Sequence, residues 1–230
     1  MSSNNIFCVA EDSCHRLWIG TYSGLNVLDK RTGEVRKIEN AELSSTGISQ
    51  ILVTSDQRIL FATEIGLYEY KEIDNSFLAY DTSNTGGGFP RATIKSLFED
   101  DRGDIWIGTW NSGLYRYEKK TGKYWKYPKM NSGNAAHVVF QDSYKNIWVG
   151  TWGSGLHLLH NAYDPERTTW TTFTHNEKQP YTISDNLIYA ISEDVNTHSL
   201  WVGTRSGLSI LPLQNGPIVF SGFENCYSGE

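Results

Sequence analysis

Long apolar runs and clusters of positive charge are both missing from this chain of 230 residues. No apolar stretch approaches the roughly 18 residues that a membrane-spanning helix requires. Lysine and arginine never form a run longer than two, and the formal net charge is −6. Because nucleic-acid binding needs clustered positive charge, we expect no nucleic-acid partner. The polar start, residues 1–5, does not have the character of a signal peptide.

Cysteine and histidine are too few and too scattered to indicate a reactive or metal-binding site. The three cysteines, Cys8, Cys14 and Cys226, form an odd set without a CxxC motif. The six histidines never occur in HExxH or another spaced ligand set, and the chain has no GxSxG motif. Acid pairs such as Glu99-Asp100 recur before turns, which indicates a structural role rather than acid–base catalysis. We therefore expect no catalytic residue, no metal and no cofactor.

Aromatic residues are abundant instead, and they mark an internal repeat. They make up 13% of the chain, with eight tryptophans and thirteen tyrosines, and aromatic side chains favour β-strands. Each repeat has a short apolar segment followed within a few residues by Gly-Leu. The Gly-Leu pairs are separated by 42, 47, 42 and 52 residues, a period typical of propeller blades. The apolar segments are 17–21, 60–63, 105–109, 147–151 and 200–204.

The third repeat shows how each unit is organised. The segment 94–100 is apolar and predicts a buried first strand, and 101–104 carries the Asp and Gly of a tight turn. A second strand is expected at 105–109, and an alternating third strand at 114–118. The fourth, outer strand is expected at 123–127. No segment of the chain sustains a 3.6-residue apolar period, so the sequence predicts almost no helix.

A sheet of four such strands is twisted and has two faces that are not easily left in water. Stacking the sheets around a centre buries both faces and leaves only short, protected edges. We therefore predict an all-β fold, a β-propeller with five four-stranded blades in one domain. The aromatic residues expected to fill the gaps between blades are Trp18, Phe61, Trp106, Trp148 and Trp201. The predicted blades are 6–47, 48–93, 94–134, 135–187 and 188–223.

The sequence of the repeat resembles that of a known family. Its pattern, Ile-x-x-Leu/Ile-x-Glu-Asp, then Leu-Trp-Ile-Gly-Thr-x-x-Gly-Leu-x-x-Tyr and Thr-Gly, resembles the two-component regulator propeller repeat. The resemblance covers all five copies and is strongest in the third and fourth, at 108–114 and 150–156. The second copy departs from the pattern, with Phe61 in place of tryptophan and Ala62 in place of glycine.

This resemblance implies a bacterial sensor. Such repeats build the periplasmic sensor region of hybrid two-component systems, many of which respond to oligosaccharides. That region usually has two successive propellers, often seven-bladed, followed by a β-sandwich, a membrane helix and a histidine kinase. We expect this chain to be an arc of a larger ring, in the periplasm as part of a membrane-anchored sensor, although five blades can also close as a small ring. The expected partners are the other modules of the parent protein, a second copy in a homodimer, and an oligosaccharide or other small ligand.

Ligand contacts are expected at one rim of the propeller. In this strand order, the loops between second and third strands share a face with the loops that lead into each blade. Long loops on a rigid frame commonly carry binding sites, and the longest loops are 81–93 and 176–186. Aromatic rings stack on sugar rings, while Arg and Asn donate hydrogen bonds to hydroxyl groups. The candidate ligand-binding residues are Tyr22, Trp110, Asn111, Trp152, Arg205 and Tyr181.

The sequence leaves alternatives open for both the site and the function. Trp110 and Trp152 can instead belong to the packing between blades. The leading interpretation is a non-catalytic, ligand-binding sensor, and the first alternative is a scaffold for protein interactions, as many propellers are. A second alternative is an enzyme similar to virginiamycin B lyase, which would need a metal with His and Glu groups converging on the rim. The scattered histidines argue against this enzyme.

Overall fold

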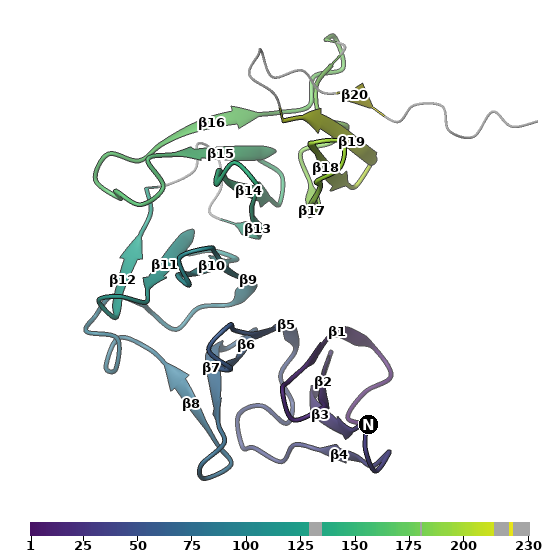
Figure 1. Ribbon diagram of the computed structural model, residues 1–230, viewed down its shortest axis with the longest axis vertical. Helices are drawn as coiled ribbons and strands as arrows, with labels where there is room; N and C mark the ends of the chain where they lie inside the picture. Colours follow the sequence, from purple (N-terminus) through teal and green to yellow (C-terminus); the bar gives the residue numbers. More distant parts are fainter. Residues whose placement is uncertain (129–134, 180, 214–220, 223–230) are drawn as a thin grey trace, which may run out of the picture. The chain divides into compact units, whose positions relative to one another are not determined.

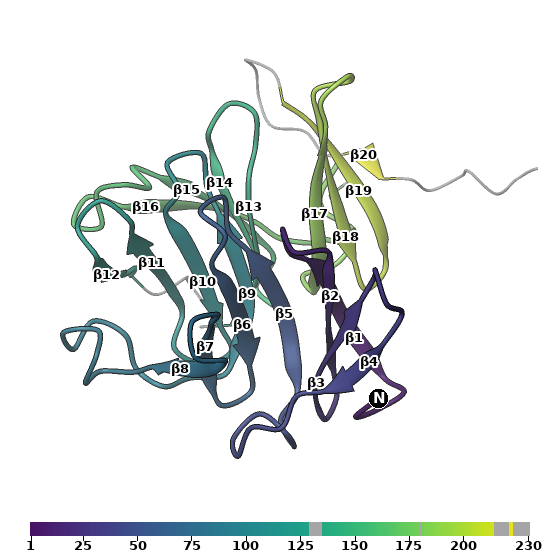
Figure 2. The same ribbon diagram turned by 60° about the horizontal axis from the view of Figure 1, so that its bottom comes forward.

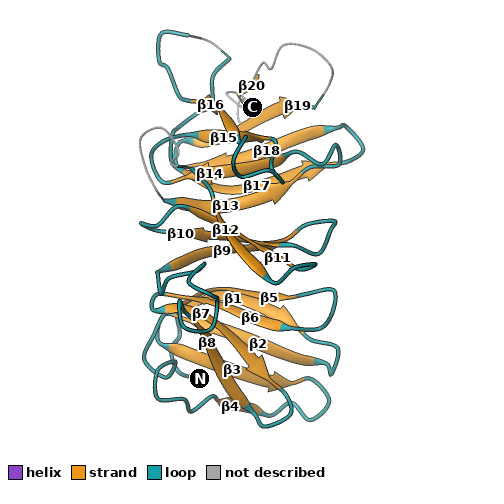
Figure 3. Ribbon diagram, turned by 90° about the vertical axis from the view of Figure 1, so that its left-hand side faces the viewer, coloured by secondary structure: helices purple, strands orange, loops and turns teal. Residues whose placement is uncertain are grey.

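The computed structural model describes residues 1–128, 135–179, 181–213 and 221–222, and all regular secondary structure in these residues is β-strand (Figure 3). The strands form five sheets of four, in each of which consecutive strands pair antiparallel. The predicted all-β fold is therefore confirmed. Parts of the predicted third, fourth and fifth blades, namely 129–134, 180, 214–220 and 223, lie outside the described residues.

The chain divides into two compact units, Met1–Lys126 and Tyr127–Glu230, and the first unit contains three blades (Figure 1). Blade 1 comprises β1 (Ile6–Glu11), β2 (Arg16–Thr21), β3 (Gly24–Asp29) and β4 (Val35–Lys37). Blade 2 comprises β5 (Ile48–Val53), β6 (Ile59–Thr63), β7 (Gly66–Lys71) and β8 (Ser76–Tyr80). Blade 3 comprises β9 (Ile94–Glu99), β10 (Ile105–Thr109), β11 (Leu114–Glu118) and β12 (Lys123–Lys126). The first strands are the inner ones, since β5 contacts both β1 and β9.

The second unit contains two blades, whose strands are labelled in the turned view (Figure 2). Blade 4 comprises β13 (Ala136–Gln141), β14 (Ile147–Thr151), β15 (Leu156–His160) and β16 (Thr169–Phe173). Blade 5 comprises β17 (Ile188–Asp194), β18 (Ser199–Thr204), β19 (Gly207–Pro212) and β20 (Ser221–Gly222). The inner strands β13 and β17 are again in contact.

A tryptophan of the second strand is tied to an aspartate in three of the blades. In blade 4 the Nε1–H of Trp148 donates to the Oδ2 of Asp142 at 2.8 Å, and Asp142 also accepts the backbone N–H of Asn146 at 2.9 Å. The same bond joins Trp18 to Asp12 at 2.7 Å and Trp106 to Asp100 at 2.8 Å. Each carboxylate thus accepts a hydrogen bond from a tight turn and another from the N–H of a buried indole, which is the only polar group of that side chain. The recurring acids have the structural role that their repetition predicted.

A threonine closes the next loop in every blade. Its hydroxyl donates to the carbonyl of the glycine that begins the Gly-Leu pair, and it accepts a backbone N–H from within the loop. The five donor–acceptor pairs, at 2.7–2.8 Å, are Thr21–Gly24, Thr63–Gly66, Thr109–Gly113, Thr151–Gly155 and Thr204–Gly207. The threonine of the Gly-Thr motif is therefore the donor, and the glycine of the Gly-Leu motif the acceptor, of one hydrogen bond.

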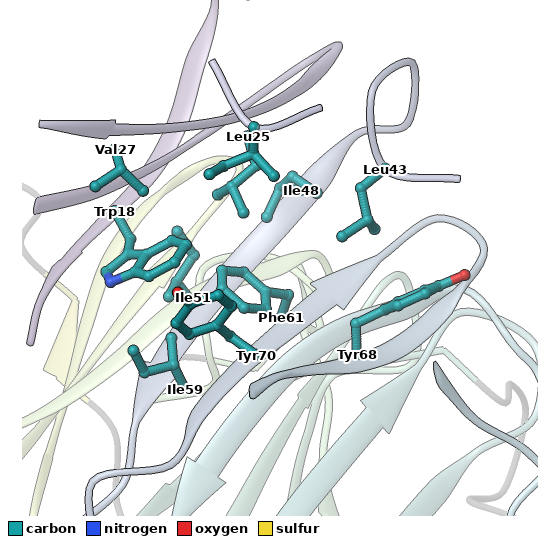
Figure 4. Close-up of a cluster of buried hydrophobic side chains, with 11 residues drawn as sticks. Trp18, Leu25, Val27, Leu43, Ile48, Ile51, Ile59, Phe61, Tyr68 and Tyr70 are labelled. Carbon is teal, nitrogen blue, oxygen red and sulfur yellow. The ribbon is translucent and has the colours of Figure 1, made fainter. Parts of the chain in front are cut away.

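This bond corrects the predicted alignment of the second blade. Counting back from Thr63, Leu60 occupies the position of the tryptophans, and Phe61 occupies that of the following isoleucine. Leu60 packs with the core shared by blades 2 and 3, whereas Phe61 points towards blade 1. Its ring centroid lies 5.5 Å from that of Trp18. Both rings belong to the core that the close-up draws (Figure 4). Phe61 does fill a gap between blades, but from the opposite face of its sheet.

Adjacent blades meet most closely where an inner strand begins over a glycine of the preceding blade. A methyl group placed on Gly20 of blade 1 would lie 2.8 Å from Cγ2 of Ile48 in blade 2. At Gly150 of blade 4 the corresponding distance, to Cγ2 of Ile188 in blade 5, is 2.5 Å. Both isoleucines are fully buried. Each glycine is also crowded by its own inner strand, at 2.5 Å from Sγ of Cys8 and 2.6 Å from Cγ1 of Val138, so neither position has room for a side chain.

Replacing Asp142 with alanine tests the tryptophan–aspartate bond. We expect Asp142→Ala to lower the free energy of unfolding by about 1–3 kcal/mol, because a buried indole N–H and a turn amide lose their acceptor. Urea denaturation monitored by tryptophan fluorescence measures the change. Glu166→Ala, an exposed acid of the same unit, is the control and should change stability by less than about 0.5 kcal/mol. Equal stability of the two variants would contradict the structural role of Asp142.

Candidate functional site

The first residue of the loop after each second strand has the same backbone partner in all five blades. Its N–H donates to the carbonyl of the residue just before the inner strand of that blade. The five bonds, at 2.9–3.3 Å, are Tyr22–Asn5, Glu64–Gly47, Trp110–Thr93, Trp152–Ala135 and Arg205–Leu187. Each of these residues therefore lies at the blade edge where the incoming loop arrives. This places Tyr22, Trp110, Trp152 and Arg205 at equivalent positions of their own blades, as the sequence predicted.

A second rim position comes from a β-bulge that sequence analysis did not reveal. In every blade the pairing of the first two strands breaks after the first residue of the inner strand, which leaves the next residue unpaired. Bulges re-aim a side chain away from the regular alternation of a strand. The bulged residues are Phe7, Ser49, Lys95, His137 and Tyr189. They share no residue type, so the sequence carries no signal of the bulge.

In blades 1 and 3 of the first unit, the bulged residue meets the loop residue. The rings of Phe7 and Tyr22 are edge to face, with centroids 6.1 Å apart, and the side chains are 54% and 60% exposed. In blade 3 the Nζ of Lys95 lies 5.3 Å from the ring centroid of Trp110, which is half-buried. Asn111 follows Trp110 and is exposed. This rim therefore presents aromatic surface beside groups that donate hydrogen bonds.

In the second unit, three rings from two adjacent blades form a cluster, which we term the rim cluster. His137 and Trp152 belong to blade 4, and their ring centroids lie 5.1 Å apart. Tyr189 of blade 5 lies 5.5 Å from Trp152, nearly perpendicular to it at 72°, and 6.2 Å from His137. Trp152 is 42% exposed and Tyr189 is 47% exposed. The indole of Trp152 is thus accessible at the rim rather than enclosed between blades.

The incoming loop of blade 5 is joined directly to this cluster. The N–H groups of Gly153 and Gly155, which flank the turn after Trp152, both donate to the carbonyl of Asn186 at 3.0 Å. The side chain of Asn186 in turn accepts the N–H of His175 at 2.7 Å. These bonds fix the two ends of the loop to the frame of blade 4. The long loop and the Trp152 loop therefore form one continuous rim.

Two further predicted site residues lie on this side of the second unit. Tyr181 is in the incoming loop, where its side chain is 68% exposed. Arg205 is exposed at the loop position equivalent to that of Trp152. Beside it, the hydroxyl of Ser206 donates to Asp185 of the incoming loop at 2.7 Å. The rim of this unit thus offers a guanidinium and a phenol in addition to the three clustered rings, and their role in binding remains a prediction.

Metal-binding groups do not gather within the described ranges, where no three or more His, Cys, Asp or Glu side chains could hold an ion. His157, on β15, is fully buried and its Nδ1 lies 3.0 Å from the hydroxyl of Thr172. Burial lowers the pKa of His157 to about 4. His160 is exposed and hydrogen-bonded to Thr171 at 2.7 Å. In the described part of the chain, no helix is long and apolar enough to cross a membrane.

Comparison with protein-family models identifies the repeat. The model described as "two component regulator propeller" matches residues 1–23, 88–111 and 131–153. Three segments of this chain match two-component regulator propeller repeats. The matched segments include the starts of blades 1, 3 and 4, and the resemblance predicted from the sequence is confirmed. No curated protein matches the chain.

Solved structures of propeller repeat proteins share this fold. The extracellular domain of one hybrid two-component system from B. thetaiotaomicron has a TM-score of 0.78 at 23% identity, over 93% of this chain and 28% of that one. A second such domain from B. thetaiotaomicron has a TM-score of 0.78 at 20% identity, over 96% and 30%. Virginiamycin B lyase from Staphylococcus aureus has a TM-score of 0.68 at 14% identity, over 96% and 71%. The chain thus spans less than a third of the two-component propeller repeat structures that it matches.

The low pKa of His157 predicts a loss of stability on acidification. The unfolded chain takes up a proton near the ordinary pKa of 6.5, whereas the folded chain does so only near about 4. The stabilisation of the folded chain by neutral His157 is therefore fully present above pH 6.5, and it is lost as the pH falls towards 4. Lowering the pH from 7 to 5 should therefore lower the free energy of unfolding by about 2 kcal/mol through this histidine. Urea denaturation at both pH values should show a smaller loss for His157→Gln, and an unchanged loss would refute the prediction.

Proposed function

We propose that this two-component regulator propeller segment is a non-catalytic, ligand-binding part of the extracellular sensor region of a bacterial signalling protein. We further propose that its ligand is an oligosaccharide bound at the rim. The observation that carries the proposal is the rim cluster of His137, Trp152 and Tyr189, three rings held on a repeated, hydrogen-bonded frame. The extracellular domains of the structurally similar two-component systems support the signalling role.

The geometry of the rim cluster suits a sugar ring. The apolar C–H face of a pyranose stacks on an exposed indole, and Tyr189 stands nearly perpendicular to Trp152 and so forms a wall beside the stacked ring. The exposed guanidinium of Arg205 is suited to hydrogen bonds with sugar hydroxyls. In the first unit, Tyr22 and Trp110 offer a similar combination of rings and polar neighbours.

Signal transmission then follows from a difference in affinity. A ligand shifts the arrangement of a sensor only as far as it binds one arrangement better than another. Under the proposal, an oligosaccharide at the rim stabilises one arrangement of this propeller and the remaining modules of a membrane-anchored parent outside the cytoplasmic membrane. A homodimer of that parent would carry the change to a histidine kinase. The small share of the matched structures that this chain spans accords with a segment of a larger sensor.

A glycan array probed with the purified chain tests the proposal. We expect selective binding of one class of oligosaccharide, and at least a tenfold weaker affinity for Trp152→Ala and for Trp110→Ala, since the stacking ring is lost. Tyr144→Ala is the matched control, because Tyr144 is 56% exposed in the turn at the opposite edge of blade 4. This control should bind like the wild type, and calorimetry with the best array ligand supplies the affinities.

Other outcomes distinguish the alternative functions. Absence of glycan binding, with specific retention of a protein partner that Trp152→Ala abolishes, would favour a scaffold over a sugar sensor. Stoichiometric metal in the purified protein, together with turnover of a cyclic peptide ester, would favour an enzyme similar to virginiamycin B lyase. Equal loss of glycan binding in the Tyr144→Ala control would mean that the rim is not the binding site.

A further inference from the structure

The residue that follows each Gly-Leu pair lies at a buried, polar position of the third strand. These five residues, which we term the latch residues, are Asn26, Tyr68, Tyr115, His157 and Ser209. Each is at most 2% exposed. A buried polar group is unfavourable unless it is hydrogen-bonded, so the partners of a latch residue indicate what the position does.

In blades 1 and 5 the latch residue holds a serine of the incoming loop by the same two contacts. The serine lies four residues before the inner strand in both blades, at Ser2 and Ser184. The N–H of Ser184 donates to Oγ of Ser209 at 2.8 Å, and the two hydroxyl oxygens are 2.7 Å apart. In blade 1 the N–H of Ser2 donates to Oδ1 of Asn26 at 2.9 Å, and Nδ2 of Asn26 donates to the Ser2 hydroxyl at 2.7 Å. Two different side chains thus make one arrangement.

In blades 2 and 3 the latch residue is a tyrosine, which reaches further into the incoming loops. The hydroxyl of Tyr68 donates to Glu42, in the loop that enters blade 2. It also accepts from Arg91, in the loop that enters blade 3, and Arg91 donates to Glu42 at 2.9 Å. The ring of Tyr115 packs edge to face against Phe89 of this second loop, with centroids 5.2 Å apart. The loop that enters blade 4 includes 129–134, which lies outside the described residues.

The loop that Ser209 holds also carries a candidate ligand-binding residue. Tyr181 lies in this loop with a φ of 71°, and its side chain is 68% exposed. Because a positive φ is unfavourable for a residue other than glycine, the surrounding contacts must maintain this conformation. The two bonds between Ser184 and Ser209 are contacts of this kind, made close to Tyr181 by a side chain that is itself completely buried.

We propose that the latch residues of blades 1, 2, 3 and 5 are positioning residues of the rim, which hold the incoming loops in their binding conformation from inside the blade. Ser209 positions the loop that presents Tyr181, and Tyr68 fixes the loops that enter blades 2 and 3 to each other. A loop that is already ordered loses less conformational entropy when a ligand binds. This contribution to affinity rests on the proposed function, whereas the ordering of the loops does not.

Hydrogen exchange of the free chain, followed by mass spectrometry, tests the ordering without any ligand. Ser209→Ala leaves the N–H of Ser184 without its acceptor, so the amides of 181–187 should exchange about tenfold faster or more. Ser192→Ala is the control, because Ser192 is an exposed serine on the inner strand of the same blade. This control should exchange like the wild type.

Tyr68→Phe applies the same test to the first unit. The loss of one hydroxyl should speed exchange in both 39–47 and 81–93, because Glu42 and Arg91 lose their shared partner. Tyr70→Phe is the matched control, since the hydroxyl of Tyr70 bonds Asn75 of the hairpin after β7 rather than a rim loop. Arg91→Ala breaks the cluster from the exposed side and should speed exchange in 39–47 without altering a buried residue.

The pattern of exchange decides the outcome. Wild-type exchange of the loops in Ser209→Ala and Tyr68→Phe would overturn the proposal. Acceleration spread evenly over the chain would also overturn it, because that pattern reports lost global stability rather than a released loop. Urea denaturation of each variant measures global stability directly.

Calorimetry with the best ligand from the glycan array tests the contribution to binding. We expect Ser209→Ala to bind about fivefold more weakly or worse, with a less favourable entropy, because the loop must then be ordered on binding. An unchanged affinity despite faster loop exchange would overturn the role in binding. Faster loop exchange in a chain that binds no glycan would refute the proposed function and still support the positioning of the loops.

Discussion

Each sheet in this chain has two apolar faces, and the burial of both faces against neighbouring sheets is the constraint on which the rest of the structure depends. It explains why Trp18, Trp106 and Trp148 are buried despite their size, and why each indole N–H needs a carboxylate. It also explains the glycines that follow them, since Gly20 and Gly150 lie under an isoleucine of the next blade.

The hydrogen bonds common to all five rim loops do not involve the side chain of the first residue of the loop. In each blade the hydroxyl of the threonine that ends the second strand donates to a glycine carbonyl, a bond that we term the threonine clip. The bond that holds the first residue of each loop joins two backbone groups. Tyr, Glu, Trp and Arg therefore occupy the same loop position without changing the frame, as Tyr22, Glu64, Trp152 and Arg205 show. The side chains at the rim can thus vary without a change in the hydrogen bonds that maintain the fold, as is common where function is carried by loops on a constant scaffold.

Most of the fold was predictable from sequence because its signals are periodic and local. The Gly-Thr and Gly-Leu markers located the sheets, and recurrence alone assigned the acids to turns. The misalignment of the second blade has a physical cause: Leu60 and Phe61 are both apolar, and only the hydroxyl bond of Thr63 fixes which of them points to which neighbour. The bulges were invisible for a related reason, since a bulge is a property of pairing between strands. His137 and Tyr189 were therefore missed, although Trp152 beside them was found.

The paired origin of the rim clarifies how specificity can arise in such repeats. Each blade has one bulged residue and one loop residue at the rim, and in blades 1, 3 and 4 the two side chains meet although they are about 15 positions apart in sequence, as with Lys95 and Trp110 or His137 and Trp152. Neighbouring blades then combine their pairs, because Tyr189 of one blade contacts Trp152 of the blade before it. Under the proposed function, a ligand that spans adjacent blades would contact a combination of pairs rather than a single pocket. Substitution at these positions changes the combination without disturbing the buried tryptophan, the aspartate or the threonine clip.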